Sequence, residues 1–390
     1  MTQIDFKNTE IAFKSLSNVD LKKAKFLFGL FGQKWLMGIG KPLLSFSLTV
    51  GLPIKGIIRR TVFHQFCGGE FIEDCVNKIN DLAKFNVKTI LDYSVEGKND
   101  ELDFRNTARE IIATIVKAKG NPKIPFCVFK ITGLAPFALL ELANDQTELT
   151  DVARSELSIV RHRIENICKT AHDAGVPILI DAEDSWIQNT IDRIAEEMME
   201  LFNKEKHIVF NTVQLYRHDR LKYIEELHER SVTNGFKPAL KIVRGAYMEK
   251  ERERARKLNY PSPIQSNKEA CDSDYNKALE YCMNHYPHFA VCAGTHNEES
   301  CEYLTKLMEE KNISPNDELI WFSQLLGMSD NISYNLAKGG YNVAKYVPYG
   351  PISEVMPYLM RRAEENSSME GQTGRELGLI QIEIERRKQL

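Results

Sequence analysis

A complete strand–helix–strand pattern occupies residues 176–216, VPILIDAEDSWIQNTIDRIAEEMMELFNKEKHIVFNTVQLY. The segment begins and ends with apolar runs rich in β-branched residues, VPILIDAE (176–183) and HIVFNTVQLY (207–216). Between them, residues 187–204 are charged and carry apolar residues at helical spacing. Continuous apolar runs suit strands that are buried on both faces, and a helix between two such strands is typical of a parallel βαβ unit.

The same pattern recurs through most of the chain. Apolar runs occupy residues 87–93, 126–134, 176–183, 207–216, 239–247, 289–297, 319–327 and 343–350. Amphipathic segments lie between them at 102–119, 153–174, 187–204, 218–233, 267–284 and 298–311. Eight strands that alternate with helices predict an α/β fold, a (β/α)8 TIM-like barrel. A doubly wound sheet is the alternative, but neither GxGxxG nor GxxxxGK spacing follows the first apolar run.

Three segments lie outside this regular alternation. Residues 1–86 are predicted to form an N-terminal helical arm, residues 87–370 the barrel, and residues 371–390 a final amphipathic helix. Inside the barrel, the connection 248–266, MEKERERARKLNYPSPIQS, is long for this fold. We expect a partly helical loop at the barrel mouth, where long loops often serve function.

Composition limits the classes of function. The 390 residues carry a net charge of −3, so no bulk attraction to nucleic acid is expected. The eight cysteines show neither CxxC nor zinc-ligand spacing, which indicates a reducing compartment and no metal site. The first twenty residues contain Asp5, Glu10 and Asp20 and no apolar run, which argues against a secretory signal. We expect a cytoplasmic protein, or a mitochondrial matrix protein if the source is eukaryotic.

Residues 21–69 form a basic segment that lacks Asp and Glu and carries eight Lys or Arg residues. Its apolar run, PLLSFSLTVGLPIKGII, is broken by Gly51, Pro53 and Lys55, so it is a poor membrane-spanning helix. Two interpretations stay open. The segment is a pair of helices packed on the barrel, or a peripheral surface for anionic lipid on the inner face of the cytoplasmic membrane.

Polar residues gather where the predicted strands end, which is where the chemistry of a barrel is expected. They are Lys130, Asp181, Gln214, Lys241, Arg244, Tyr247, Thr295, His296, Asn297 and Tyr346. Each residue alone has an ordinary structural explanation, such as a helix cap or a satisfied loop carbonyl. Their coincidence at strand ends indicates a functional site.

The segment YLMRRAEEN (358–366) places Tyr358, Arg361, Arg362 and Glu365 on one helix face. One interpretation is an amphipathic surface helix whose arginines lie in water. The other is an anion clamp, in which two guanidinium groups bind one carboxylate. The helix would follow the eighth strand directly and begin at the barrel mouth, which favours the clamp.

The motifs VFKITGL, IDAE, KIVRGAYMEKERERA, GTHN, KYVPYG and YLMRRAEENSS together identify a family. In this order they resemble the FAD-dependent proline dehydrogenases, over roughly residues 87–370. The family fold is a distorted (β/α)8 barrel whose last helix lies over the C-terminal mouth. The resemblance implies oxidation of L-proline to Δ1-pyrroline-5-carboxylate, with hydride passing from proline C5 to N5 of FAD. It further implies a membrane quinone as electron acceptor and a separate pyrroline-5-carboxylate dehydrogenase that takes the product.

The resemblance also implies roles for individual residues. The substrate would contact Lys130, Leu325, Tyr346, Tyr358, Arg361, Arg362 and Glu365, the two arginines binding its carboxylate. The cofactor would contact Ala182, Gln214, Lys241, Val243, Arg244, Gly245, Ala246, Tyr247, Ser266, Asn267, Lys268, Thr295, His296 and Asn297. Asp181, Lys241 and Arg244 would serve catalysis. Many bacterial members have Arg where this chain has Lys241, so whether Lys241 or Arg244 is the donor nearest flavin N5 stays open.

Three other functions remain as alternatives. A hydroxyproline dehydrogenase of the same fold would need room for a 4-hydroxyl group, and the bulk of Tyr346 favours proline instead. A barrel lyase would use Lys130 as a Schiff-base nucleophile. A non-catalytic amino-acid-binding protein would keep the arginine clamp and lack turnover.

Overall fold

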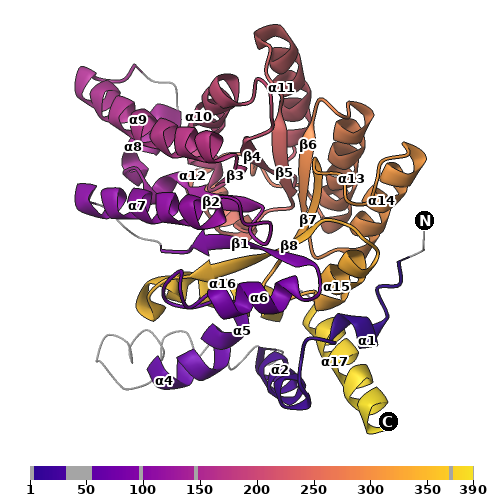
Figure 1. Ribbon diagram of the computed structural model, residues 1–390. Helices are drawn as coiled ribbons and strands as arrows, with labels where there is room; N and C mark the ends of the chain where they lie inside the picture. The colour runs from indigo at the N-terminus through magenta and orange to yellow at the C-terminus, as the bar shows by residue number, and fades with distance from the viewer. Residues whose placement is uncertain (1–3, 32–54, 96–99, 145–147, 369–371, 390) are drawn as a thin grey trace. The chain divides into compact units, whose positions relative to one another are not determined.

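The computed structural model describes residues 4–31, 55–95, 100–144, 148–368 and 372–389, and its eight parallel strands form a closed barrel (Figure 1). The strands follow one another around the barrel in chain order. They are β1 (Val87–Tyr93), β2 (Phe126–Lys130), β3 (Ile178–Asp181), β4 (Val209–Gln214), β5 (Ala239–Val243), β6 (Ala290–Gly294), β7 (Ile320–Leu325) and β8 (Val343–Tyr349). The predicted (β/α)8 barrel is confirmed, and the closed sheet excludes the doubly wound alternative.

Helices alternate with the strands, as the amphipathic segments predict. They are α7 (Glu101–Ala118), α9 (Asp151–Ala174), α10 (Ser185–Phe202), α11 (Arg220–Asn234), α13 (Lys268–Asn284), α14 (Glu298–Glu310), α15 (Asp330–Lys338) and α16 (Ile352–Ser368). Two shorter helices, α8 (Phe137–Asn144) and α12 (Met248–Leu258), lie in connections after β2 and β5. The connection 248–266 is therefore partly helical, as expected.

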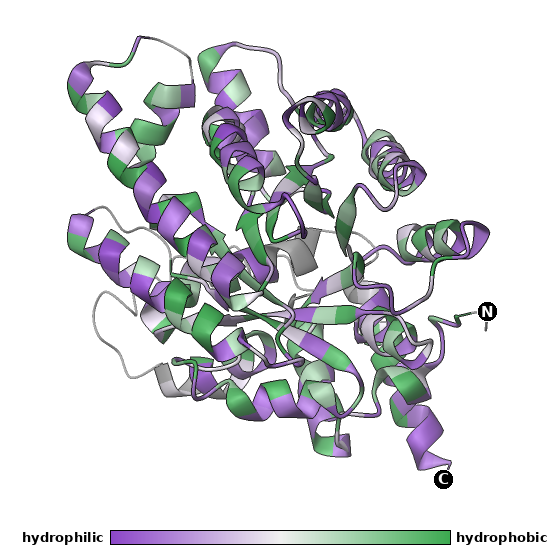
Figure 2. Cartoon of the chain, turned by 45° about the horizontal axis from the view of Figure 1, so that its top comes forward, coloured by the Kyte–Doolittle hydropathy of each residue, from purple (hydrophilic) through white to green (hydrophobic). Residues whose placement is uncertain are grey.

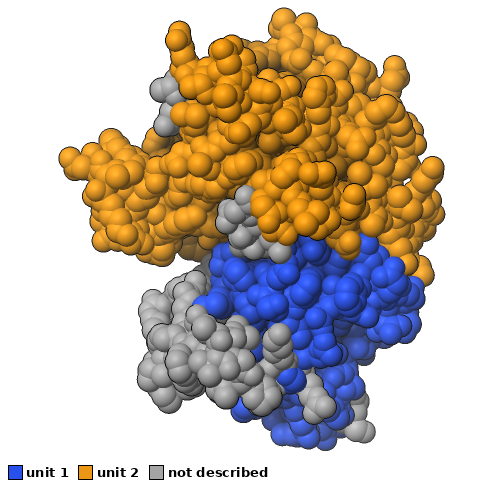
Figure 3. Space-filling view, turned by 90° about the vertical axis from the view of Figure 1, so that its left-hand side faces the viewer, with its two compact units in different colours: residues 1–96, 324–390 blue, residues 97–323 orange. Residues whose placement is uncertain are grey.

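The chain divides into two compact units, residues 1–96 with 324–390 and residues 97–323 (Figure 3). In the second unit the strands are buried along most of their length, and β3 and β4 are buried throughout. Apolar residues concentrate on these strands and on the helix faces that cover them (Figure 2). Helix starts are fixed locally, since Asp100, Thr150, Asn267 and Asn297 accept hydrogen bonds that cap α7, α9, α13 and α14.

The first unit joins both ends of the chain. Its β1 and β8 pair in parallel from Val87↔Val343 to Tyr93↔Tyr349. Its remaining helical segments are α1 (Thr9–Ala12), α2 (Asn18–Phe31), α4 (Lys55–Ile58), a π-helical turn (Arg59–Phe63), α5 (His64–Phe66), α6 (Val76–Ala83) and α17 (Gln372–Lys388). Side chains of α1, α2, α16 and α17 share one apolar core that includes Phe13, Phe28, Leu359 and Ile380. The two ends of the chain therefore stabilise one another.

Helices occupy much of the described parts of residues 1–86 and 371–390, and the division into a helical arm, a barrel and a C-terminal helix stays a prediction. Of the basic segment 21–69, residues 32–54 lie outside the described residues. In the described part, Leu21, Leu27 and Phe28 of α2 are buried, which fits a packed helix. Among the helices that the structure describes, none is both long and apolar enough to cross a bilayer.

Candidate active site

The carboxylate of Asp181 lies between two lysines at the strand ends of the second unit. Asp181 ends β3 and stands opposite Lys130, which ends β2. Its Oδ2 accepts a hydrogen bond of 3.3 Å from Lys130 Nζ, and its Oδ1 is ion-paired with Lys241 of β5. Burial favours the neutral acid, but the two ammonium groups outweigh it, so the pKa of Asp181 lies below its ordinary value. Three predicted residues thus form one buried cluster with an excess of positive charge.

Gln214, at the end of β4, is held by a neighbouring strand end. Its amide nitrogen donates 2.7 Å to the carbonyl of Glu183, so one part of this side chain has the structural role considered for it. The Glu183 carboxylate accepts a bond of 3.0 Å from the amide of Thr132, and burial raises its pKa to about 7. Glu183 was not predicted as a site residue, although the IDAED motif carries it two positions after Asp181.

Arg244 is a fixed cation just beyond β5. Its three guanidinium nitrogens donate to Asp272 (2.6 Å), Thr295 (2.7 Å) and Ser300 (2.9 Å). Its guanidinium carbon also lies 4.3 Å from the centre of the Tyr275 ring. The predicted pair Arg244 and Thr295 is therefore in direct contact, and Arg244 joins the end of β5 to β6, α13 and α14.

The backbone after Arg244 forms an open, glycine-dependent surface. Gly245 and Ala246 are exposed, and Val243 and Tyr247 are half-buried. The φ angle of Gly245 is +139°, which side-chain-bearing residues rarely adopt. A Cβ at this position would also lie 2.5 Å from the ring of Tyr216. The geometry requires glycine and leaves a surface that a flat ring could approach closely.

The remaining predicted cofactor residues cluster at two helix starts. Asn267 accepts a bond of 2.8 Å from Ala270 N and caps α13, while Asn297 accepts one of 2.9 Å from Ser300 N and caps α14. Lys268 forms an ion pair with Asp272. Of the other predicted cofactor residues, Ala182 and Thr295 are buried, His296 is half-buried and Ser266 is exposed. The positive ends of α13 and α14 suit the binding of a phosphate group.

In the first unit, the motif YLMRR lies in α16 with its first arginine half-buried and its second buried. Arg362 is 6% exposed, and its guanidinium carbon lies 5.0 Å from the centre of the Tyr358 ring. A solvated surface helix would leave this arginine in water, so the burial favours the clamp. Arg361 is half-buried, whereas the side chain of Glu365 lies outside the described part of the chain. Tyr346 of β8 is buried and Leu325, the last residue of β7, is half-buried.

A family model described as proline dehydrogenase matches residues 75–375. The chain belongs to the proline dehydrogenase family. The match includes every predicted site residue, from Lys130 to Glu365. The resemblance inferred from the motifs is confirmed.

Three relatives have similar sequences over most of the chain. The carbapenem antibiotics biosynthesis protein CarD of Pectobacterium carotovorum subsp. carotovorum is 32% identical over 322 residues, which is 83% of each chain. Proline dehydrogenase 1, mitochondrial, of Dictyostelium discoideum is 32% identical, with coverage of 87% of this chain and 67% of that protein. Proline dehydrogenase 1, mitochondrial, of Arabidopsis thaliana is 30% identical, with coverage of 90% and 79%.

Solved structures support the same fold. Proline utilization A (PutA) from Bdellovibrio bacteriovorus, inactivated by N-propargylglycine, matches with a TM-score of 0.73 and 19% identity. That match covers 94% of this chain and 37% of the solved chain. A variant of PutA from Bradyrhizobium japonicum matches with a TM-score of 0.66 and 19% identity, covering 80% and 31%. The chain thus spans about a third of the length of these longer proteins.

Proposed function

We propose that this chain oxidises L-proline to Δ1-pyrroline-5-carboxylate in proline catabolism, with FAD as cofactor. The observation that carries the proposal is the family match over residues 75–375, which contains all the predicted site residues. FAD, when bound, supplies the chemistry by accepting the hydride of proline C5 at its N5 atom. The chain's own residues bind the substrate, orient it and supply charge.

Arg361 and Arg362 are proposed to bind the proline carboxylate. Guanidinium groups present paired donors in a geometry that matches a carboxylate, and a buried arginine binds it more strongly than one in water. Tyr346, Tyr358 and Leu325 are proposed to line the pyrrolidine ring, and Glu365 to pair with an arginine. Fixing the carboxylate orients the ring carbon that loses hydride.

The lysine–aspartate cluster is proposed to provide the electrostatic part of catalysis. Lys130 and Lys241 outnumber the Asp181 carboxylate, which stays ionised because both ammonium groups contact it. A buried site with net positive charge stabilises negative charge that develops during cofactor reduction. Arg244 adds a second fixed cation, and either Lys241 or Arg244 is proposed as the donor nearest flavin N5.

FAD is proposed to lie against the Gly245–Tyr247 backbone. The exposure of Gly245 and Ala246 supports this placement. The N-termini of α13 and α14, with Ser266, Lys268 and His296 nearby in sequence, are proposed for the dinucleotide part. Gln214 and Ala182 complete the proposed set.

Electrons are proposed to leave to a membrane quinone, and a separate pyrroline-5-carboxylate dehydrogenase to consume the product. Helix α2 supports a peripheral contact with the inner face of the cytoplasmic membrane. It exposes Val19 (60%), Phe26 (64%) and Leu30 (38%) on the face opposite its buried residues. Lysines at 22, 23 and 25 are also exposed on this helix. A basic helix with apolar side chains in water is typical of contact with anionic lipid.

The alternative functions are less well supported. Lys130 is ion-paired with Asp181, and a charged ammonium is a poor Schiff-base nucleophile, which argues against the lyase. Tyr346 is buried, 7% exposed, and its bulk is proposed to exclude a 4-hydroxyl group, which favours proline over hydroxyproline.

The activity can be tested by incubating the FAD-loaded protein with L-proline and a soluble quinone analogue, then identifying the product by mass spectrometry. We expect a product lighter than proline by two hydrogens, formed in proportion to quinone reduction. D-Proline serves as the stereochemical control. Absence of any product from L-proline in the presence of bound FAD would contradict the proposal.

A further inference from the structure

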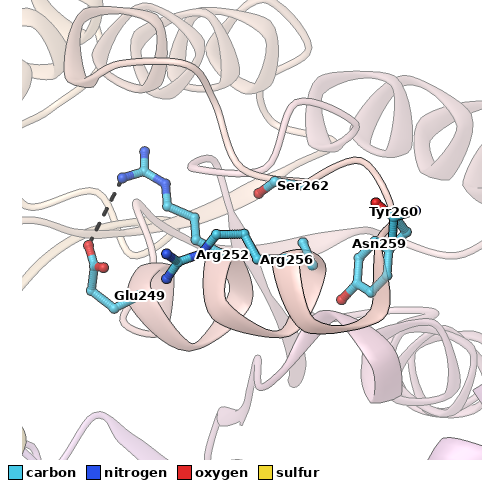
Figure 4. Close-up of a pocket in the computed structure, with 7 residues that line it drawn as sticks. Glu249, Arg252, Arg256, Asn259, Tyr260 and Ser262 are labelled. Atoms are coloured by element: carbon cyan, nitrogen blue, oxygen red, sulfur yellow. Dashed lines mark ion pairs between the residues drawn. The ribbon is translucent and has the colours of Figure 1, made fainter.

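Helix α12 is held by charge rather than by an apolar core. Of its eleven residues, MEKERERARKL, eight are charged. The buried residues of this helix are Glu251 and Ala255. A shallow pocket of about 560 Å³ separates Arg252 and Arg256 from Ser262 of the following segment (Figure 4). An isolated helix of this length is marginal in water, so the contacts of its few buried groups decide whether α12 stays in place.

Glu251 caps another helix. It is fully buried, and its two carboxylate oxygens accept bonds from the backbone nitrogen of Ser185 (2.7 Å) and from the Ser185 hydroxyl (2.6 Å). Ser185 is the first residue of α10, and the preceding Asp184 makes no side-chain capping bond to that helix. A carboxylate at a helix N-terminus satisfies an otherwise orphan donor and interacts favourably with the helix dipole. Glu251 is therefore the strongest single attachment of α12.

Weaker contacts surround this bond. Lys250 pairs with Asp184 at 2.7 Å and Arg254 with Glu141 at 2.5 Å. Lys250 and Arg254 also lie 5.1 and 4.4 Å from the centre of the Trp186 ring. The lysine is 57% exposed and the arginine 33% exposed, so salt and water screen both ion pairs.

Polar rather than apolar groups lie next to the buried carboxylate. Glu251 and Arg217 are close enough to interact electrostatically, as are Glu251 and Tyr216. The Tyr216 hydroxyl and one terminal nitrogen of Arg217 are buried, and neither has a hydrogen-bond partner among the described residues. Detachment of α12 would give these polar groups access to water, which offsets part of the free-energy cost of releasing the helix.

Residues with positive φ angles flank both ends of α12. Gly245, two residues before the N-cap Tyr247, has φ +139°, and the C-cap Asn259 has φ +54°. The amide of Glu251 donates 2.9 Å to the carbonyl of Tyr247. Anchoring Glu251 thus fixes the Tyr247 peptide, and its release would free the segment from Gly245 onward.

We propose that Glu251 is a positioning residue that latches α12 onto the N-terminus of α10 and so holds the Gly245–Tyr247 backbone in place for FAD. The latch sets how tightly FAD is bound and how long it is retained. This inference rests on the proposed function, because that function places FAD against the same backbone.

The test compares Glu251→Ala, Glu251→Gln and the matched control Glu253→Ala. Glu253 lies on the same helix, is exposed, and pairs with Lys257. For each full-length variant, FAD affinity and release are measured by flavin fluorescence. Tryptic cleavage inside α12, which offers five Lys or Arg sites, is followed with and without FAD. Thermal unfolding checks that each variant is folded.

We expect Glu251→Ala to weaken FAD binding about tenfold, as for the loss of a hydrogen bond to a charged group, and to speed cleavage in α12. Glu251→Gln should fall between it and the wild type, because its amide oxygen can still accept from Ser185 N. Glu253→Ala should match the wild type, and FAD should slow cleavage of α12 in the wild type. These results would support the latch.

If Glu251→Ala binds FAD with wild-type affinity, the proposed link between Glu251 and FAD binding is wrong, whether or not cleavage in α12 becomes faster. Equal cleavage of Glu251→Ala and Glu253→Ala would overturn the latch itself. If the wild type does not bind FAD, the proposed function fails instead, and the cleavage comparison without FAD still decides whether Glu251 anchors α12. If Glu251→Ala is unfolded, Glu251→Gln decides the same two points.

Discussion

Replacing Asp181 by asparagine should strongly destabilise the protein. The substitution keeps the shape of the side chain and removes the negative charge that two lysines share. Lys241 is buried and the Lys130 side chain is 21% exposed, so both cations would lose this carboxylate at a place with little access to water. Removing one partner of a buried ion pair costs far more than removing a surface pair.

The size of the effect follows from the geometry. At 3.3 Å and an effective dielectric constant of about 20, the attraction between Lys130 and Asp181 is about 5 kcal/mol before desolvation is subtracted. Lys241 contributes a second contact to the other oxygen. Mutational losses at such pairs are about 3–5 kcal/mol. We expect Asp181→Asn to lower the free energy of unfolding by that amount near neutral pH.

The assay is urea unfolding followed by tryptophan fluorescence, with Asp173→Asn as the control. Asp173 also pairs with a lysine, Lys169, but on the surface, so its loss should leave the free energy of unfolding unchanged. Because the pKa of folded Asp181 lies below the ordinary 3.8, its stabilisation is complete above that value and is lost as pH falls through the folded pKa. The gap between wild type and Asp181→Asn should therefore close in acid.

A double variant tests whether the buried lysines cause the loss of stability in Asp181→Asn. Asp181→Asn with Lys241→Met should be more stable than Asp181→Asn alone, because it removes one buried cation that has lost the Asp181 carboxylate. A loss below about 1 kcal/mol in Asp181→Asn, the range of a surface pair, would refute the reasoning. So would a double variant that is no more stable than the single one.

Further predictions concern binding, specificity and pH. Arg362→Met should lower kcat/KM for proline roughly 10- to 100-fold by raising KM, the loss expected for a hydrogen bond to a charged group, whereas an unchanged KM would argue against the clamp. Gly245→Ala should weaken FAD binding, because φ is +139° at this position and the new Cβ would lie 2.5 Å from the Tyr216 ring. Titration with FAD measures the affinity. A wild-type affinity would contradict the proposed contact of FAD with the Gly245–Tyr247 backbone. Tyr346→Ser should shift the ratio of kcat/KM values toward hydroxyproline, and a constant ratio would exclude the steric explanation. Burial and two neighbouring histidines lower the pKa of His288, so the folded protein binds fewer protons than the unfolded one near pH 6 and loses stability as pH falls below 6.5. His288→Gln should reduce the loss of stability below pH 6.5. An unchanged pH–stability curve would rule out His288 as the cause of that loss.

The fold could be predicted from sequence because each strand of the barrel is a continuous apolar run. A strand that is buried on both faces needs apolar residues at successive positions, which is a strong local signal. In the helices between the strands, apolar residues recur at helical spacing. Asn267 and Asn297, predicted only as cofactor contacts, stand directly before their helices and cap them. Several of the residues predicted to act together do meet, as Lys130, Asp181 and Lys241 show.

Other parts of the site could not be predicted because their partners are far apart in the chain. Spacing alone could not distinguish a solvated Arg362 from a buried one, since the same four-residue pattern suits both. Glu251 lies in a segment of alternating charge that is typical of a solvated helix, and its partner Ser185 is 66 positions away. The contacts of Arg244 with Asp272 and Ser300 likewise depend on how the βα units pack.

The most direct test of the central claim is a visible absorption spectrum of the purified protein, taken without oxygen before and after L-proline is added. We expect a yellow, oxidised-flavin band that bleaches with L-proline and bleaches less with hydroxyproline. A yellow band that proline leaves unchanged would contradict the proposed substrate. A colourless protein that added FAD cannot reconstitute would contradict the proposed cofactor and, with it, the account of the site.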